Sequence, residues 1–131
     1  MKQISDSNEL FFGNLQKKYK SLIDNLKDII FHIDNDGKMV FVNKAWERIL
    51  GYTVEESHGM HFKDFIFSDD LDNAFKIFND ILVREGEYVP HQLRGVTKQG
   101  HIIWVEISAW LSVDNDNKVI GIFGSITDIT E

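Results

Sequence analysis

Short turn sequences divide the apolar stretches of this chain into hairpins, and this feature limits most strongly the folds open to it. The segments IIFHID and KMVFVN flank the turn NDGK, whose Asn, Asp and Gly tolerate a positive φ angle. The turns KQG and DNDN separate three later apolar stretches, roughly Tyr88–Thr97, His101–Val113 and Lys118–Thr127. Consecutive strands joined by short turns pair antiparallel. The sequence therefore predicts a sheet of five antiparallel strands.

The segment before the first strand has a helical pattern. Its apolar residues, from Phe12 to Ile29, are spaced alternately by three and four positions, which makes a heptad seam. The seam is too short to form a convincing coiled coil alone. We expect this helix either to lie on the sheet of its own domain or to pair with its copy in a dimer.

The segment between the hairpins contains helix start and stop signals. Asn43 is placed to cap a helix that ends at Gly51, and Thr53 begins a capping box. Ser68 begins the longest internal helix, which extends to about Arg84. Helices packed on one face of an antiparallel sheet make an α+β domain.

The composition excludes several classes of function. A net charge of −7 argues against direct binding to nucleic acid or to an anionic membrane surface. The absence of cysteine excludes disulfides, thiolate metal sites and cysteinyl–flavin chemistry. The sequence has no nucleotide-binding or hydrolase motif, and the two histidines of HGMH lack a third metal ligand at a useful spacing. With no signal peptide and no long apolar run, we expect a non-catalytic, metal-free cytoplasmic domain without membrane contact.

Four motifs in order resemble a PAS sensory domain: IIFHIDNDGKMVFVNKAWERILGYTVEE, a long helix after SDD, TKQGHIIWVEISA and GSITDITE. The resemblance covers about residues 24–131, and it implies a five-stranded antiparallel sheet with helices on one face. Residues 1–28 then form an N-terminal flanking and dimerisation helix with a frayed start, and residues 29–131 form the PAS domain. One stretch departs from the family, because relatives often have His-Pro-x-Asp where this chain has Phe67-Ser68-Asp69-Asp70. Ser68 still supplies a cap, so we expect the same fold.

The resemblance and the strand alternation predict a cavity between the sheet and the helices. His91 is the one titratable side chain expected there, either as the anchor of a small apolar or mono-acidic ligand or as a core histidine bonded to backbone. The aromatic rings either fill this interior or leave room for such a ligand. The predicted lining consists of Phe31, Ile33, Trp46, Phe62, Phe65, Phe75, Phe78, His91, Leu93, Val105, Ile107 and Ile122.

The two cofactors best known in the PAS family are not expected in this chain. Its light-sensing members hold flavin through three polar amides, and the matching positions here are Gly95, Val105 and Ile126. Its haem-binding members ligate iron from the long helix, and residues 69–84 contain no histidine. His32, on the opposite sheet face, and His101, beside a turn, are expected to be solvated.

Large aromatic side chains on the outer face of the sheet would form an exposed apolar patch. The heptad helix is the obvious cover, so we expect a homodimer in which helix and sheet face meet within or across protomers. The predicted interface consists of Phe12, Leu15, Tyr19, Leu22, Leu26, Trp104, Trp110 and Phe123.

The residues Asp128, Ile129 and Thr130 resemble the junction at which PAS domains pass to a downstream effector. The short acidic side chain can accept hydrogen bonds and fix the exit of the chain; the alternative is a simple cap at the end of a strand. The resemblance implies a sensor and dimerisation module of a signalling protein with a histidine kinase, diguanylate cyclase or phosphodiesterase downstream. The alternative is an interaction module with a filled core that relays the state of a neighbouring domain.

Overall fold

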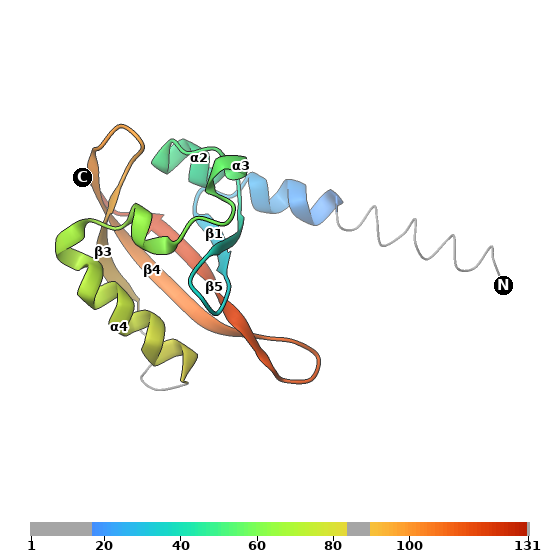
Figure 1. Cartoon of the computed structure of the whole chain (residues 1–131). Coiled ribbons are helices and arrows are strands. Elements are labelled where there is room, and N and C mark those ends of the chain that lie inside the picture. Colours follow the sequence, from blue (N-terminus) through green and yellow to red (C-terminus); the bar gives the residue numbers. More distant parts are fainter. Residues whose placement is uncertain (1–16, 84–89, 131) are drawn as a thin grey trace.

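The computed structural model describes residues 17–83 and 90–130, and it forms one antiparallel sheet with helices on one face (Figure 1). Residues 17–24 are helical and precede the first strand. The elements that follow are β1 (Ile29–Ile33), β2 (Met39–Val42), α2 (Ala45–Leu50), α3 (Val54–Ser57), η1 (Phe62–Phe65), η2 (Ser68–Asp70), α4 (Leu71–Leu82), β3 (His91–Val96), β4 (Ile102–Val113) and β5 (Val119–Asp128).

The five strands lie in the order β2-β1-β5-β4-β3, and every neighbouring pair is antiparallel. The first and last strands of the chain are therefore adjacent at the centre of the sheet, with Phe31 opposite Gly124. Helix α4 packs against β4 and β5, and α2 packs against β1. These observations confirm the predicted α+β class and the five-stranded sheet.

Both predicted long turns use the same side-chain chemistry. In the β1–β2 turn, the Asp34 carboxylate accepts hydrogen bonds from the backbone N–H groups of residues 36 and 38. In the β4–β5 turn, Asp114 accepts the two equivalent bonds from residues 116 and 118. A residue with positive φ completes each turn, Gly37 at 84° and Asn117 at 61°. The turn residues thus set the hairpins as the sequence predicted.

The core lies between the sheet and the helices. Strand β1 alternates as expected for a sheet with one buried face, with its odd-numbered residues buried and its even-numbered ones half-buried. The largest fully buried side chain is Trp46 of α2. Its indole Nε1–H donates to Ser57 Oγ at 2.8 Å, and the Ser57 hydroxyl donates in turn to the Thr53 carbonyl. The only polar group of the Trp46 side chain is therefore hydrogen-bonded, and its ring packs edge-on against Phe65 in the core.

The N-terminal helix ends earlier than the heptad pattern predicted. The helical residues end at 24, so Leu26 lies after the helix and Ile29 opens β1, where it is fully buried in the core. Ile29 is part of the strand and not of the helix because it shares the buried face of β1 with Phe31 and Ile33. Phe12 and Leu15 lie outside the described residues. In Figure 1 the helical segment 17–24 points away from the sheet.

Asn43 does not cap α2, contrary to the prediction. Its fully buried side chain instead joins the end of the N-terminal helix to the start of β1. Oδ1 accepts a hydrogen bond from Ile30 N–H at 3.0 Å, while Nδ2 donates to the carbonyls of Ile23 at 2.7 Å and Asp28 at 3.1 Å. These three bonds fix where the flanking helix meets the domain.

Helix α4 also begins differently from the prediction. Ser68 lies in the 3-10 turn η2 and makes no capping bond. The residue before α4 is Asp70, and its carboxylate is bound by Arg94 of β3 rather than by the helix N–H groups. The capping box at Thr53 is confirmed, as is the end of α2 at Gly51, which adopts φ 85°. No helix of the described residues is long and apolar enough to cross a membrane.

Candidate functional site

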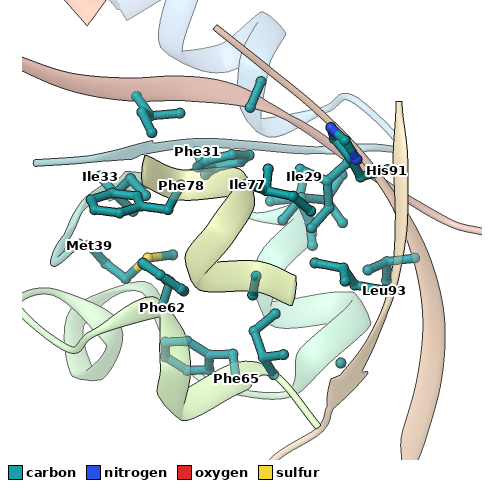
Figure 2. Close-up of a pocket in the computed structure, with 18 of the residues that line it drawn as sticks. Ile29, Phe31, Ile33, Met39, Phe62, Phe65, Ile77, Phe78, His91 and Leu93 are labelled. Atoms are coloured by element: carbon teal, nitrogen blue, oxygen red, sulfur yellow. The ribbon is translucent and has the colours of Figure 1, made fainter. Parts of the chain in front are cut away.

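A cavity of about 110 Å³ lies between α4 and the inner face of the sheet (Figure 2). Every strand except β2 contributes several of its inward residues, and α2, η1 and α4 close the other side. The cavity is lined by Ile29, Phe31, Ile33, Met39, Trp46, Leu50, Phe62, Phe65, Ile66, Ala74, Ile77, Phe78, Ile81, His91, Leu93, Gly95, Val105, Ile107, Ala109, Ile122 and Ile126.

The structure brings eleven of the twelve predicted lining residues together in this cavity. Phe75 is the exception, because its side chain is 36% exposed and stacks on Phe62 at a ring distance of 5.1 Å. The inward face of α4 consists instead of Ala74, Ile77, Phe78 and Ile81, whose spacing of three, one and three positions is a regular helical face. The predicted lining shared Phe78 with this face but included Phe75 in place of Ala74, Ile77 and Ile81.

Among the described residues the lining is apolar, and His91 is the only titratable side chain in it. His91 is the first residue of β3, directly opposite Ile107, and its ring is half-buried. Figure 2 shows its ring nitrogens as the only nitrogen atoms among the drawn side chains. No hydrogen bond joins the His91 ring to another of the residues 17–83 and 90–130. An imidazole can donate and accept one hydrogen bond each, so this ring offers the cavity its one side-chain polar contact.

The three positions that correspond to the flavin-holding amides all lie in the lining. Gly95, Val105 and Ile126 face the cavity from β3, β4 and β5. None of the three has a side-chain amide, hydroxyl or charge. At these positions the cavity therefore presents carbon atoms and no hydrogen-bonding side chain.

Two ion pairs bind the helices to the β3 edge, outside the cavity. The Arg94 guanidinium donates to both carboxylate oxygens of Asp70, at 2.7 and 3.0 Å. These hydrogen bonds hold the pKa of Asp70 below its usual value and raise the pKa of Arg94. At the β3–β4 turn, Lys98 contacts both oxygens of Glu56 at 3.0 Å, and this contact lowers the pKa of Glu56.

The outer face of the sheet carries an aromatic row. Phe41, His32, Phe123 and Trp110 lie directly opposite one another across β2, β1, β5 and β4. Phe123 and Trp110 are 45% and 39% exposed, with ring centres 5.7 Å apart. Trp104 lies farther along β4 and is also exposed. These aromatics lie on the outer face, as the strand alternation predicted, and the described helical residues leave them uncovered.

The expectation that His32 is solvated is wrong. In the sheet it lies directly opposite Phe41 on one side and Phe123 on the other, and its Nε2 atom is shielded from solvent without a partner among the described residues. Side chains directly opposite one another on one face of a sheet lie close enough to shield each other from water. His101 is exposed, as predicted. Of the predicted helix residues of the interface, Tyr19, Leu22 and Leu26 are exposed.

The C-terminal junction is held to β4 by a compact set of hydrogen bonds. The Asp128 carboxylate accepts from Thr130 N–H at 2.9 Å. The Thr130 hydroxyl bonds both the N–H and the carbonyl of Trp104, at 2.9 and 3.2 Å, and Ile129 N–H donates to the same carbonyl. The carboxylate thus fixes the local turn, and the hydroxyl binds the chain after β5 to one residue of β4.

Metal ligation finds no support in the described part of the chain. Across residues 17–83 and 90–130, no group of three or more His, Asp or Glu side chains could hold an ion. In the HGMH segment, His61 Nδ1 accepts a hydrogen bond from Lys63 N–H and so serves the start of η1.

Comparison with known proteins places these features in a family. The family model described as the PAS fold matches residues 17–129. A PAS domain structure from Colwellia psychrerythraea superposes with a TM-score of 0.78 at 23% identity, over 88% of this chain and 98% of that one.

Two curated proteins that contain similar segments are named as a kinase and a probable cyclase. Sporulation kinase C of Bacillus subtilis is 28% identical over all of this chain and 30% of its own length. The probable diguanylate cyclase DgcE of Escherichia coli is 23% identical over 76% of this chain and 9% of its own length. The chain therefore spans less than a third of the curated relatives that it matches.

Proposed function

The chain belongs to the PAS family, and on that premise we propose that it is the sensory module of a signal-transduction protein. The observation that carries the proposal is the cavity of about 110 Å³, apolar except for His91, beneath the helix α4. Sensing then requires that a ligand binds one arrangement of the domain better than another and so shifts the population.

The size and chemistry of the cavity define a ligand class. A dry apolar cavity of about 150 Å³ accepts benzene, which has six non-hydrogen atoms, so this smaller cavity suits a molecule of no more than about six. A short apolar chain would bury its carbon atoms against the isoleucine and phenylalanine side chains. A single carboxylate or hydroxyl group would bond the His91 ring. We therefore propose short mono-acidic or mono-hydroxylated aliphatic compounds as ligands.

Native mass spectrometry of the freshly purified chain, with an absorbance scan, tests whether a ligand is retained. A retained small mass would support the sensor and identify the chemical class. If the protein carries no added mass, titration with xenon distinguishes an empty cavity from a filled interior. Saturable shifts of the cavity methyl resonances would show a usable cavity, whereas no shift would favour a ligand-free relay module.

We also propose that the chain forms a homodimer in which the flanking helix packs on the outer face of the sheet, within or across protomers. The exposed aromatic residues of both segments support this, since an uncovered patch of Trp110, Phe123 and Phe41 is costly to leave in water. The double variant Trp110→Glu, Phe123→Glu should be monomeric at micromolar concentration by analytical ultracentrifugation. A variant that stays dimeric would exclude this patch. Glu106→Gln, which changes the charge of another outer-face residue of β4, serves as the control.

The similarity to segments of a kinase and a cyclase supports an effector beyond the sensory module. We propose that the module is non-catalytic and cytoplasmic, and that the effector is a histidine kinase or a cyclic-dinucleotide enzyme. Ligand-dependent autophosphorylation or cyclase activity of the full-length protein, compared with its His91→Leu variant, tests this assignment.

A further inference from the structure

Arg94 of β3 contacts both the start of α4 and the segment before it. Its guanidinium binds Asp70 at the start of α4, and its backbone N–H donates to the same carboxylate at 2.8 Å. Its carbonyl accepts a hydrogen bond from Phe67 N–H at 2.9 Å. The start of α4 is therefore bound to one residue of β3 by both side-chain and backbone contacts.

The same guanidinium lies between two aromatic rings. Its central carbon is 4.8 Å from the ring centre of Phe67 and 5.2 Å from that of Trp104. Trp104 is the residue directly opposite Arg94 in the β3–β4 pair. A planar guanidinium can form a two-bond contact with a carboxylate and stack on a ring at once, which a lysine ammonium cannot do.

Trp104 is also the residue that holds the C-terminal junction. Its N–H and carbonyl both bond the Thr130 hydroxyl, and its carbonyl accepts from Ile129 N–H at 3.0 Å. The contacts therefore form an unbroken series from α4, which covers the cavity, through Arg94 and Trp104 to the exit of the chain.

We propose that Arg94 couples the position of α4 to the conformation of the C-terminal junction. This inference rests on the proposed sensory function, because it assigns the route by which cavity occupancy reaches the exit. When α4 moves on its cavity side, Asp70 moves with the start of the helix and draws the guanidinium from its place between the rings. Trp104 then loses the contact that orders it, and the bonds of Thr130 and Ile129 to its backbone weaken.

The position of Asp70 explains why a movement at the cavity reaches Arg94. Ala74 lies one helical turn after Asp70, is buried, and lines the cavity. A group inserted beside Ala74 therefore acts on the first turn of α4, next to the ion pair. The Glu56–Lys98 pair also joins a helix to the β3 edge of the sheet, and among the described residues no hydrogen bond or ion pair links its side chains to α4 or Trp104, so it provides a control.

Amide hydrogen exchange by NMR on the 131-residue chain tests the coupling without any ligand. Arg94→Lys keeps the charge but removes the two-bond contact and the stacking. We expect the Ile129 amide to exchange about fivefold faster or more, relative to the amides of β1, since typical coupling between sites begins near this factor. Lys98→Ala should leave that ratio unchanged. Equal acceleration in both variants, or none in Arg94→Lys, would overturn the proposal.

A second measurement tests the link to the cavity itself. Ala74→Ile fills space beneath α4 and should shift the Ile129 and Thr130 amide resonances; Ala74→Val replaces it if the larger side chain prevents folding. In the Arg94→Lys background the same substitution should shift these resonances less than half as far. Equal shifts in both backgrounds would show a route that bypasses Arg94. Neither measurement uses a ligand, so it tests the coupling separately from the proposed sensory function. If xenon binds but these variants show no effect, the coupling is wrong and the cavity stands. If xenon does not bind but the variants behave as expected, the cavity is wrong and the coupling stands.

Discussion

Replacement of Asn43 by alanine should destabilise the domain far more than an average polar-to-alanine change. The Asn43 side chain is 0% exposed and makes three hydrogen bonds to backbone groups of residues 23, 28 and 30. Alanine leaves one N–H and two carbonyl groups without these partners. An unsatisfied buried group costs about 1–3 kcal/mol, and these partly buried groups belong at the lower end. The expected loss is therefore about 3 kcal/mol, a large part of the 5–15 kcal/mol typical of a domain.

Urea unfolding followed by tryptophan fluorescence measures this loss. Asn35→Ala is the control, because Asn35 is exposed and makes a single bond, from Nδ2 to the Val119 carbonyl at 3.0 Å. We expect that variant to lose less than about 0.5 kcal/mol. Asn43→Asp should be at least as harmful as Asn43→Ala near neutral pH, because it places a charged oxygen against two carbonyl oxygens. A loss below about 1 kcal/mol for Asn43→Ala, or one equal to the control, would refute the reasoning.

Three further results are expected. Thr53→Ala should lower the free energy of unfolding in urea by about 1 kcal/mol, because it removes a capping hydrogen bond. Ser68→Ala should lower it by less than about 0.5 kcal/mol, because Ser68 makes no capping bond. Equal losses would contradict this assignment of caps. Gly124→Ala should cost about 1–3 kcal/mol, because the added Cβ would overlap the Ser108 carbonyl oxygen; an unchanged unfolding midpoint would contradict that contact. Arg94 holds the pKa of Asp70 below its usual 3.8, so the ion pair stabilises the folded domain fully above that pH and loses this effect as the pH falls through the folded pKa. Asp70→Asn should therefore reduce the loss of stability on the acid side of a stability–pH profile. An unchanged acid side would exclude the ion pair as its cause.

The sequence was most informative where structure depends on neighbouring residues. The hairpins follow from turn chemistry at Asp34 and Asp114, and the capping box at Thr53 follows from residues three apart. Strand alternation sorted Phe31, Val105 and Ile122 onto one face of the sheet, because the period of a strand fixes which face each side chain takes. The resemblance to PAS domains then indicated that this face lines the cavity, where the structure has all three residues.

The predictions failed where a side chain had more than one possible partner. Asn43 and Ser68 are both good caps, yet Asn43 serves distant backbone groups and Ser68 lies in a separate 3-10 turn. Asp70 prefers a guanidinium that is 24 positions away in sequence. His32 is half-buried, with Nε2 shielded, opposite residues of two other strands, whose positions no local pattern reveals. Contacts of this kind depend on the register of distant segments and become visible only in the folded domain.

The most direct test of the sensory cavity is a methyl NMR titration of the chain with butanoate and with butan-1-ol. The account predicts saturable shifts of the Val105, Ile107 and Ile122 methyl groups, with dissociation constants between about 10 μM and 1 mM for so small a ligand. It also predicts that His91→Leu weakens butanoate binding about tenfold or more, while Phe75→Leu, outside the lining, leaves it within about twofold. Methyl shifts that do not saturate, or butanoate binding that is indifferent to His91→Leu, would contradict a cavity that recognises its ligand through His91.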